Sequence, residues 1–368
     1  MSFITAIGTA NPSHQFSQEA LADFMVRSMQ LSHDDERKLR TIFRATGIDN
    51  RYSVLSDYGK SKDFEFYPNT PDFEPFPSTQ KRLEAFRDHA LPLSLAAIEN
   101  MKLNASIDLQ KITHLIVVSC TGMYAPGLDI DIIKSLQLPT TTQRTCITFM
   151  GCYAAFNALK VADAYCTSDA NSKVLIVCTE LCSLHFQKTP TENNLLANAL
   201  FADGSAAVLV EANSDQPVTL SLEEFHNDLA PEGEHDMAWS VGDLGFEMKL
   251  SAYVPSIIQS GIQQLTNSLL KKIAKEIQDI KHIAIHPGGK KIVEVIEHQM
   301  NLSKDQNKHA LEVLKQYGNM SSPTVLFVLN EIFKTLSKAD DGERILSLAF
   351  GPGLTLESMV LKIHSANA

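Results

Sequence analysis

The chain lacks the sequence features of several protein classes. No apolar run approaches the ~18 residues that a membrane-spanning helix needs, and residues 1–8 lack the basic segment of a secretory signal. Six cysteines among 368 residues include no Cys-x-x-Cys pair, so neither a disulfide framework nor a structural zinc site is expected. We therefore expect a cytoplasmic protein with reduced thiols and no membrane span.

Basic residues are also scarce. The chain has 32 Lys and Arg against 43 Asp and Glu, a formal net charge of -11. Nucleic-acid binding needs a basic surface, so we expect no nucleic acid as a partner. The length is sufficient for a large core, and it predicts two domains or one duplicated architecture.

Apolar runs alternate with segments of helical periodicity. Strands are expected at residues 3–7, 115–119, 174–179, 205–210, 218–225, 282–285, 345–349 and 357–363. Helices are expected at 16–29, 33–46, 80–101 (with a break or kink at Pro92), 153–165, 255–275, 290–299, 304–316 and 322–337. Residues 63–77 are expected to form a loop packed by aromatic side chains. The alternation predicts an α/β fold with buried sheets.

Cys152 is the most informative residue, because it lies between a short apolar run and a helix-like stretch. A helix N-terminus carries partial positive charge and free N–H groups. Both favour the thiolate, which is the nucleophilic form of cysteine. The alternative is that Cys152 is a buried side chain that behaves as a small hydrophobe.

Two downstream residues are candidate partners of this thiol. His286 begins a His-Pro-Gly-Gly motif after an apolar run, and Asn319 lies in the segment Tyr-Gly-Asn-Met-Ser-Ser at the expected start of a helix. His286 could instead be a turn residue, and Asn319 a helix N-cap. Together, a Cys, a His and an Asn at the edges of regular elements are the components of an acyl-accepting nucleophile.

An ordered set of motifs carries a family resemblance. The matching segments are residues 120–122 with 125–127, 151–152, 199–204, 286–289, 317–322 and 349–355. In this order the chain resembles the type III polyketide synthases, the chalcone synthase-like branch of the thiolase superfamily, over nearly its whole length. Residues 180–186 and 236–239 look closer to bacterial members.

The resemblance implies a thiolase-like, five-layered α-β-α-β-α fold of two similar halves. The N-terminal half, residues 1–214, would carry the nucleophilic Cys, and the C-terminal half, residues 215–368, the catalytic His and Asn. It also implies a homodimer. No metal or redox cofactor is implied, because coenzyme A thioesters are the substrates.

The resemblance also implies roles for particular residues. Cys152 would be the nucleophile, with His286 and Asn319 as its partners. Phe201 matches the first gatekeeper of the cavity, and the second would be Met248 by an ungapped count or Phe246 after a two-residue shift. The remaining substrate-binding candidates are Cys120, Cys182, His185, Met237, Trp239, Ser321, Gly288, Gly289, Phe350, Gly351, Pro352 and Gly353. For His185 a satisfied cavity histidine is an equal alternative, and the glycines could be ordinary turn residues.

The resulting functional hypothesis is loading of an acyl-CoA starter on Cys152 and its extension with malonyl-CoA by decarboxylative Claisen condensation. Cys120 and Cys182 stand where plant enzymes carry hydroxyl residues, and Trp239 stands at a small position. We therefore expect aliphatic starters and alkylpyrone or alkylresorcinol products. The alternatives are a ketoacyl synthase III-like enzyme of fatty-acid initiation, which takes an acyl carrier protein, and an inert binding or scaffold protein.

Overall fold

The computed structural model describes residues 1–103, 105 and 107–365. Its strands form a nine-stranded mixed sheet in the order β11-β12-β13-β8-β1-β7-β6-β4-β5. One part comprises β1 (Phe3–Ala10), β4 (His114–Ser119), β5 (Gln143–Thr148), β6 (Lys173–Leu181) and β7 (Asp203–Glu211). The other comprises β8 (Thr219–Leu229), β11 (His282–Ile285), β12 (Arg344–Gly351) and β13 (Thr355–His364). Only two residue pairs, Phe3–Ser221 and Ile4–Leu220, join β1 to β8.

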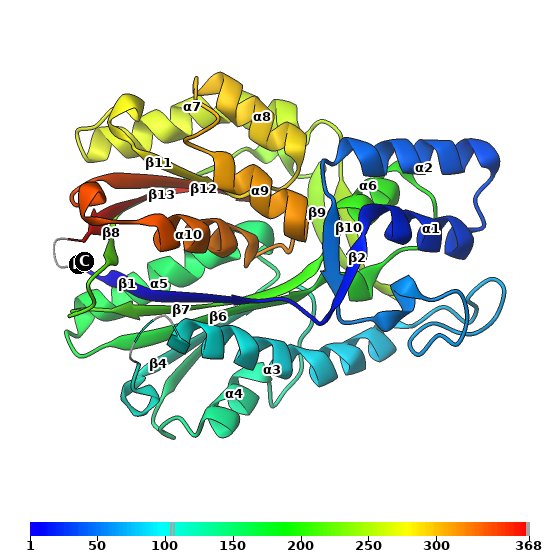
Figure 1. Ribbon diagram of the computed structural model, residues 1–368, viewed down its shortest axis with the longest axis horizontal. Coiled ribbons are helices and arrows are strands. Elements are labelled where there is room, and N and C mark those ends of the chain that lie inside the picture. The colour runs from blue at the N-terminus through cyan, green and yellow to red at the C-terminus, as the bar shows by residue number, and fades with distance from the viewer. Residues whose placement is uncertain (104, 106, 366–368) are drawn as a thin grey trace.

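Helices divide the two parts of the sheet into five layers (Figure 1). The helix α3 (Thr79–Leu103) packs on β1, β7 and β6 with α4 (Leu128–Leu136) beside it. In the middle lie α5 (Ala154–Ser168) and α10 (Thr324–Thr335). On the far side, α7 (Val254–Lys272) packs on β8 and β13, and α8 (Lys290–Gln299) packs on α7. The predicted five-layered α/β fold is confirmed.

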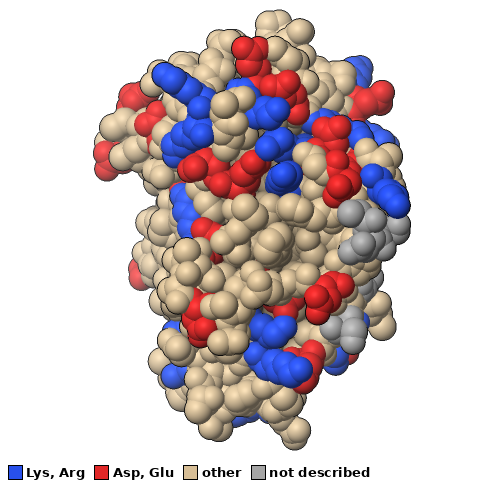
Figure 2. Space-filling view, turned by 90° about the vertical axis from the view of Figure 1, so that its left-hand side faces the viewer, with Lys and Arg blue, Asp and Glu red and all other residues tan. Residues whose placement is uncertain are grey.

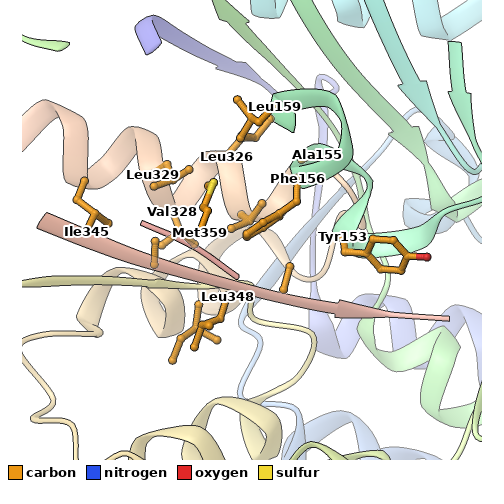
Figure 3. Packing of buried hydrophobic residues seen from close by; sticks show 14 of the residues in the cluster. Tyr153, Ala155, Phe156, Leu159, Leu326, Val328, Leu329, Ile345, Leu348 and Met359 are labelled. Carbon is orange, nitrogen blue, oxygen red and sulfur yellow. The ribbon is translucent and has the colours of Figure 1, made fainter. Parts of the chain in front are cut away.

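The middle layer contains much of the hydrophobic core. Figure 3 shows Phe156 and Leu159 of α5 gathered with Leu326 and Leu329 of α10 and with Met359 of β13. All five side chains are buried. Full burial of such a side chain contributes roughly 1.5–3 kcal/mol, so this layer holds both the segment before α5 and the segment before α10 in place.

Most predicted elements are present, with two notable corrections. A break or kink is expected at Pro92 from the sequence. The break is absent, because α3 continues from Thr79 through Pro92 to Leu103. Proline removes one helical hydrogen bond, and the buried residues Phe86, Ala90 and Ala97 hold the helix against the sheet. The helix expected at 304–316 is the shorter α9 (Lys308–Tyr317).

A smaller lobe lies at one end of the layers, at the right of Figure 1. It consists of β2 (His14–Ser17), α1 (Gln18–Met29), α2 (His33–Ala45), β3 (Asn50–Ser53), α6 (Glu192–Leu200), β9 (Met237–Gly242) and β10 (Gly245–Leu250). The expected aromatic loop is confirmed here, since Tyr67 and Phe73 both contact Phe24. The helices α4 and α6 and the strands β2, β3, β5, β9 and β10 were not expected from the sequence. The strands β5 and β9 lack the buried apolar pattern that identifies the others.

The surface has charges of both signs. Figure 2 shows Lys and Arg side chains beside Asp and Glu side chains on one face of the protein. Some of the oppositely charged side chains form ion pairs near strand ends, such as Lys173–Glu211 and Arg344–Glu223. Within the described residues, no helix combines the length and apolar character needed to cross a membrane.

Candidate active site

Cys152 lies in a single 3₁₀ turn, Gly151–Tyr153, between β5 and α5. Gly151 has φ +76°, and a Cβ there would lie 2.4 Å from Cδ of Pro352. A Cβ on Gly351 would lie 2.5 Å from a ring carbon of Tyr153. At position 151 only glycine tolerates both the left-handed backbone and the close approach, and at position 351 only glycine tolerates the close approach. The loop after β12 therefore packs directly against the turn that carries the thiol.

A cavity of about 40 Å³ adjoins Cys152. Most of the predicted site residues line it, although they are distant in sequence. These are Cys120, Cys152, Cys182, Phe201, Met237, Trp239, Met248, His286, Gly288, Asn319, Ser321, Phe350 and Pro352. The structure thus brings the predicted Cys, His and Asn together in one buried space.

Several contacts orient Asn319. Its Oδ1 lies 3.9 Å from Sγ of Cys152 and accepts a 2.8 Å hydrogen bond from the N–H of Ser321, while its Nδ2 donates to the carbonyl of Gly288 at 3.2 Å. Its backbone pairs with Phe201 in an isolated bridge. The alternative of a helix N-cap is wrong, because α10 begins at Thr324 and its N-cap is Pro323.

His286 follows β11 and is buried, with neither ring nitrogen hydrogen-bonded within the described part of the chain. Burial lowers the pKa of His286 to about 3. Burial also raises the pKa of Cys152 to about 12, while hydrogen bonding with Ser321 and Asn319 acts in the opposite direction. Burial therefore opposes the thiolate that was expected for Cys152 at a helix N-terminus. A neutral thiol beside a neutral imidazole is favoured, since burial penalises both charges.

Glu180, at the end of β6, is the most important site residue that sequence reasoning missed. Its carboxylate accepts hydrogen bonds from the hydroxyls of Ser322 at 2.6 Å and Thr121 at 2.8 Å, and from the N–H of Cys120 at 2.9 Å. Burial raises the pKa of Glu180 to about 7. The sequence does contain a signal for this role, namely a single carboxylate within an apolar strand. A carboxylate that is buried in this way needs several hydrogen-bond donors.

The structure distinguishes the two candidates for the second gate by their positions. Met248 lines the cavity beside Cys152 together with Phe201. Phe246 lines a neighbouring cavity of about 50 Å³, and its ring stacks on His185 at 4.4 Å. The two cavities share Cys182, Phe201, Trp239 and Met248 as walls. Of the two candidates, only Met248 therefore lies in the wall that the cavities share.

His185 is a satisfied histidine. Its Nε2–H donates to the carbonyl of Thr121 at 2.7 Å, and its Nδ1 accepts the N–H of Phe246 at 2.9 Å. Burial lowers the pKa of His185 to about 3, so the ring is neutral and both nitrogens are used.

The remaining predicted site residues lie outside the lining of the cavity. Gly289 is the N-cap of α8, and Gly351 and Gly353 shape the loop around Pro352. Across the described ranges, no group of three or more His, Cys, Asp and Glu side chains could hold a metal ion.

Comparison with known protein families matches both parts of the chain. A sequence model described as "Chalcone and stilbene synthases, N-terminal domain" matches residues 1–214. The corresponding C-terminal domain matches residues 221–365.

Individual relatives agree with this assignment. The chain is 31% identical over 98% of its length to "Probable polyketide synthase 1" of Dictyostelium discoideum, of which it spans only 11%. It is 29% identical over 98% of its length to the "Alpha-pyrone synthesis polyketide synthase-like Pks18" of Mycobacterium tuberculosis, of which it covers 91%.

Solved structures show the same relationship. The C-terminal type III polyketide synthase domain of "Steely1" from Dictyostelium superimposes with a TM-score of 0.90 at 30% identity, and the match covers 98% of this chain and 99% of that domain. PKS-I of the brown alga Ectocarpus siliculosus also gives a TM-score of 0.90, at 29% identity and 98% coverage of both chains. The chain belongs to the chalcone and stilbene synthase family, the type III polyketide synthases, which are condensing acyltransferases.

Proposed function

We propose that the chain loads an acyl group from a coenzyme A thioester onto Cys152 and extends it with malonyl-CoA by decarboxylative Claisen condensation. The observation that carries the proposal is the 3.9 Å approach of Asn319 Oδ1 to Cys152 Sγ in a buried cavity that His286 also lines. The family membership favours this function over fatty-acid initiation by a ketoacyl synthase.

In the loading step, neutral His286 takes the proton of the Cys152 thiol. The thiolate attacks the thioester carbonyl, and coenzyme A leaves as a thiolate that recovers the proton. Burial leaves the resting imidazole unprotonated and able to accept this proton. The same burial disfavours the charged pair that results, so the pair forms only transiently.

In the extension step, malonyl-CoA loses carbon dioxide, and the electron pair of the broken C–C bond becomes an enolate. The enolate oxygen needs aimed donors. One N–H of Asn319 Nδ2 is bonded to Gly288, which leaves the second for this oxygen. The enolate carbon then attacks the acyl carbonyl on Cys152 and releases the Cys152 thiolate.

We infer an aliphatic starter and an alkylpyrone or alkylresorcinol product. Cys120, Cys182 and Met237 line the cavity with weakly polar groups, and the indole of Trp239 fills part of it, held by a 2.7 Å bond to the carbonyl of Cys120. The name of the relative Pks18 refers to α-pyrone synthesis, which supports this class of product.

We also infer a cytoplasmic homodimer. All six cysteines are free thiols, as is usual in a reducing compartment. The strand β5 is an edge of the sheet with mostly exposed side chains, and an unpaired edge favours association with a second strand.

Cys152→Ala tests the function directly. With octanoyl-CoA, intact-protein mass spectrometry should show an octanoyl adduct on the unmodified protein and none on the variant. With malonyl-CoA added, only the unmodified protein should release a pyrone or resorcinol. Cys178→Ala is the matched control, because Cys178 is also buried but lies outside the cavity lining. Normal acylation of Cys152→Ala, or a requirement for an acyl carrier protein, would contradict the proposal.

A further inference from the structure

The second cavity has a volume of about 50 Å³. It shares part of its wall with the cavity beside Cys152 and continues beyond that wall. Apolar side chains such as Phe16, Met25 and Phe186 line one part of it. Among the described residues of its lining, Arg51 is the only Lys or Arg. Among the described residues that line the cavity beside Cys152, none is a Lys or Arg. The guanidinium is therefore the distinctive chemical group of the second cavity.

Arg51, on β3, is buried and uses three of its five N–H groups. Its Nε donates to Oε1 of Gln18 at 2.8 Å, and its Nη1 donates to the carbonyls of Asn198 at 2.8 Å and Phe201 at 2.7 Å. Its Nη2 has no hydrogen-bond partner among the described residues. Because guanidinium has five donors and no acceptor, two N–H groups on one nitrogen remain for a ligand.

No carboxylate of the described residues forms an ion pair with Arg51. The nearby acid Asp203 instead accepts the N–H of Val54 at 2.8 Å and both the N–H and the hydroxyl of Ser183, at 2.8 and 2.6 Å. Burial lowers the pKa of Arg51 only to about 10, so it stays charged at neutral pH. A buried charge without a direct counter-ion is costly, and an anionic ligand group would offset that cost.

We propose that the second cavity binds a carboxylate at the far end of the starter, so that Arg51 selects aliphatic acyl thioesters that end in a carboxylate. The inference rests on the proposed function, because it concerns the tail of the acyl group loaded on Cys152. The volume of about 50 Å³ is suited to a small group and not to a nucleotide. The tail passes the wall at Met248, a side chain that adapts its shape readily and is only partly buried.

The test compares octanoyl-CoA with octanedioyl-CoA, which have equal chain length and differ only in the terminal carboxylate. We expect the unmodified protein to prefer octanedioyl-CoA by about tenfold in kcat/KM, the range of one charge-assisted hydrogen bond. Arg51→Lys and Arg51→Met should reduce the preference, Arg51→Met to none. Circular dichroism and the thermal unfolding midpoint report on the folding of each variant.

Arg82→Lys is the matched control. Arg82 is also buried with an unpartnered Nη2, but it lines neither cavity, so its variant should keep the preference. If the Arg51 variants do not fold, Met248→Trp supplies a second test: it obstructs the passage while leaving Arg51 intact, and it should abolish the preference.

The outcomes separate the inference from the function on which it rests. Equal or better use of octanoyl-CoA by the unmodified protein overturns the carboxylate site, as does an unchanged preference in a folded Arg51→Met variant. Failure of the unmodified protein to acylate Cys152 with either thioester contradicts the proposed function instead.

Discussion

Ser322 donates a 2.6 Å hydrogen bond to Glu180 across 142 residues of sequence. The bond joins the end of β6 to the loop that carries Asn319. The same carboxylate binds the N–H of Cys120, and Cys120 Sγ in turn accepts the N–H of Gly151 at 3.0 Å. Glu180 thus links the loops on either side of the nucleophile. Burial is the main cause of the raised pKa of Cys152, and the charge of Glu180 acts in the same direction.

Glu180→Gln should change the dependence of stability on pH. Burial raises the pKa of Glu180 to about 7, above about 4.3 for an unperturbed glutamate. Its stabilising contribution is therefore complete below the unfolded pKa and is lost as the pH rises through about 7. Thermal unfolding from pH 4 to 8 should show a smaller decline in Tm for the neutral variant. Parallel Tm profiles would show that Glu180 does not titrate in this range.

Asn319→Ala and His286→Ala should separate the two chemical steps. Asn319→Ala should keep some starter loading and lose malonyl-CoA decarboxylation, because its amide serves the enolate. His286→Ala should impair both steps, because the imidazole also takes the thiol proton. Each lost donor should cost about 3 kcal/mol, roughly a hundredfold in rate. Acyl-enzyme formation and carbon dioxide release measure the steps separately, and equal losses of loading would contradict this division.

Gly151→Ala should destabilise the protein more than Gly342→Ala. Both glycines have positive φ, +76° and +79°, which costs an alanine about 1–2 kcal/mol. A Cβ at 151 would also meet Pro352 at 2.4 Å, whereas one at 342 meets nothing within 4 Å. Urea denaturation of the two variants isolates the steric contribution. Equal losses of unfolding free energy would mean that the 350–353 loop moves away without cost.

Trp239 should discriminate against aromatic starters. The unmodified protein should have a higher kcat/KM with octanoyl-CoA than with p-coumaroyl-CoA, because the indole occupies space in a cavity of about 40 Å³. Trp239→Ala should raise relative activity with p-coumaroyl-CoA, whereas Trp239→Phe, which retains most of the bulk, should change it little. A clear advantage of p-coumaroyl-CoA in the unmodified protein would refute the aliphatic starter and leave the condensation chemistry untouched.

Sequence reasoning succeeded where local pattern and structure coincide. The strand expected at 282–285 is β11, because an apolar run bounded by turn residues suits a strand buried on both faces. The helix expected at 16–29 is α1, and Ser17 caps it by accepting the N–H of Ala20. The strand β5 was missed because its side chains are mostly exposed, and Pro92 suggested a break that packing on the sheet prevents.

The sequence by itself determined the fold class and the identity of the three candidate catalytic residues, since both depend on local periodicity and on motifs in a recognisable order. Only the tertiary structure decided the protonation state that burial favours for Cys152 and His286, the position of Met248 in the wall, and the roles of Glu180 and Arg51. These properties depend on burial and on hydrogen bonds between residues that are distant in sequence. Their electrostatic consequences appear when packing removes water from the charged groups.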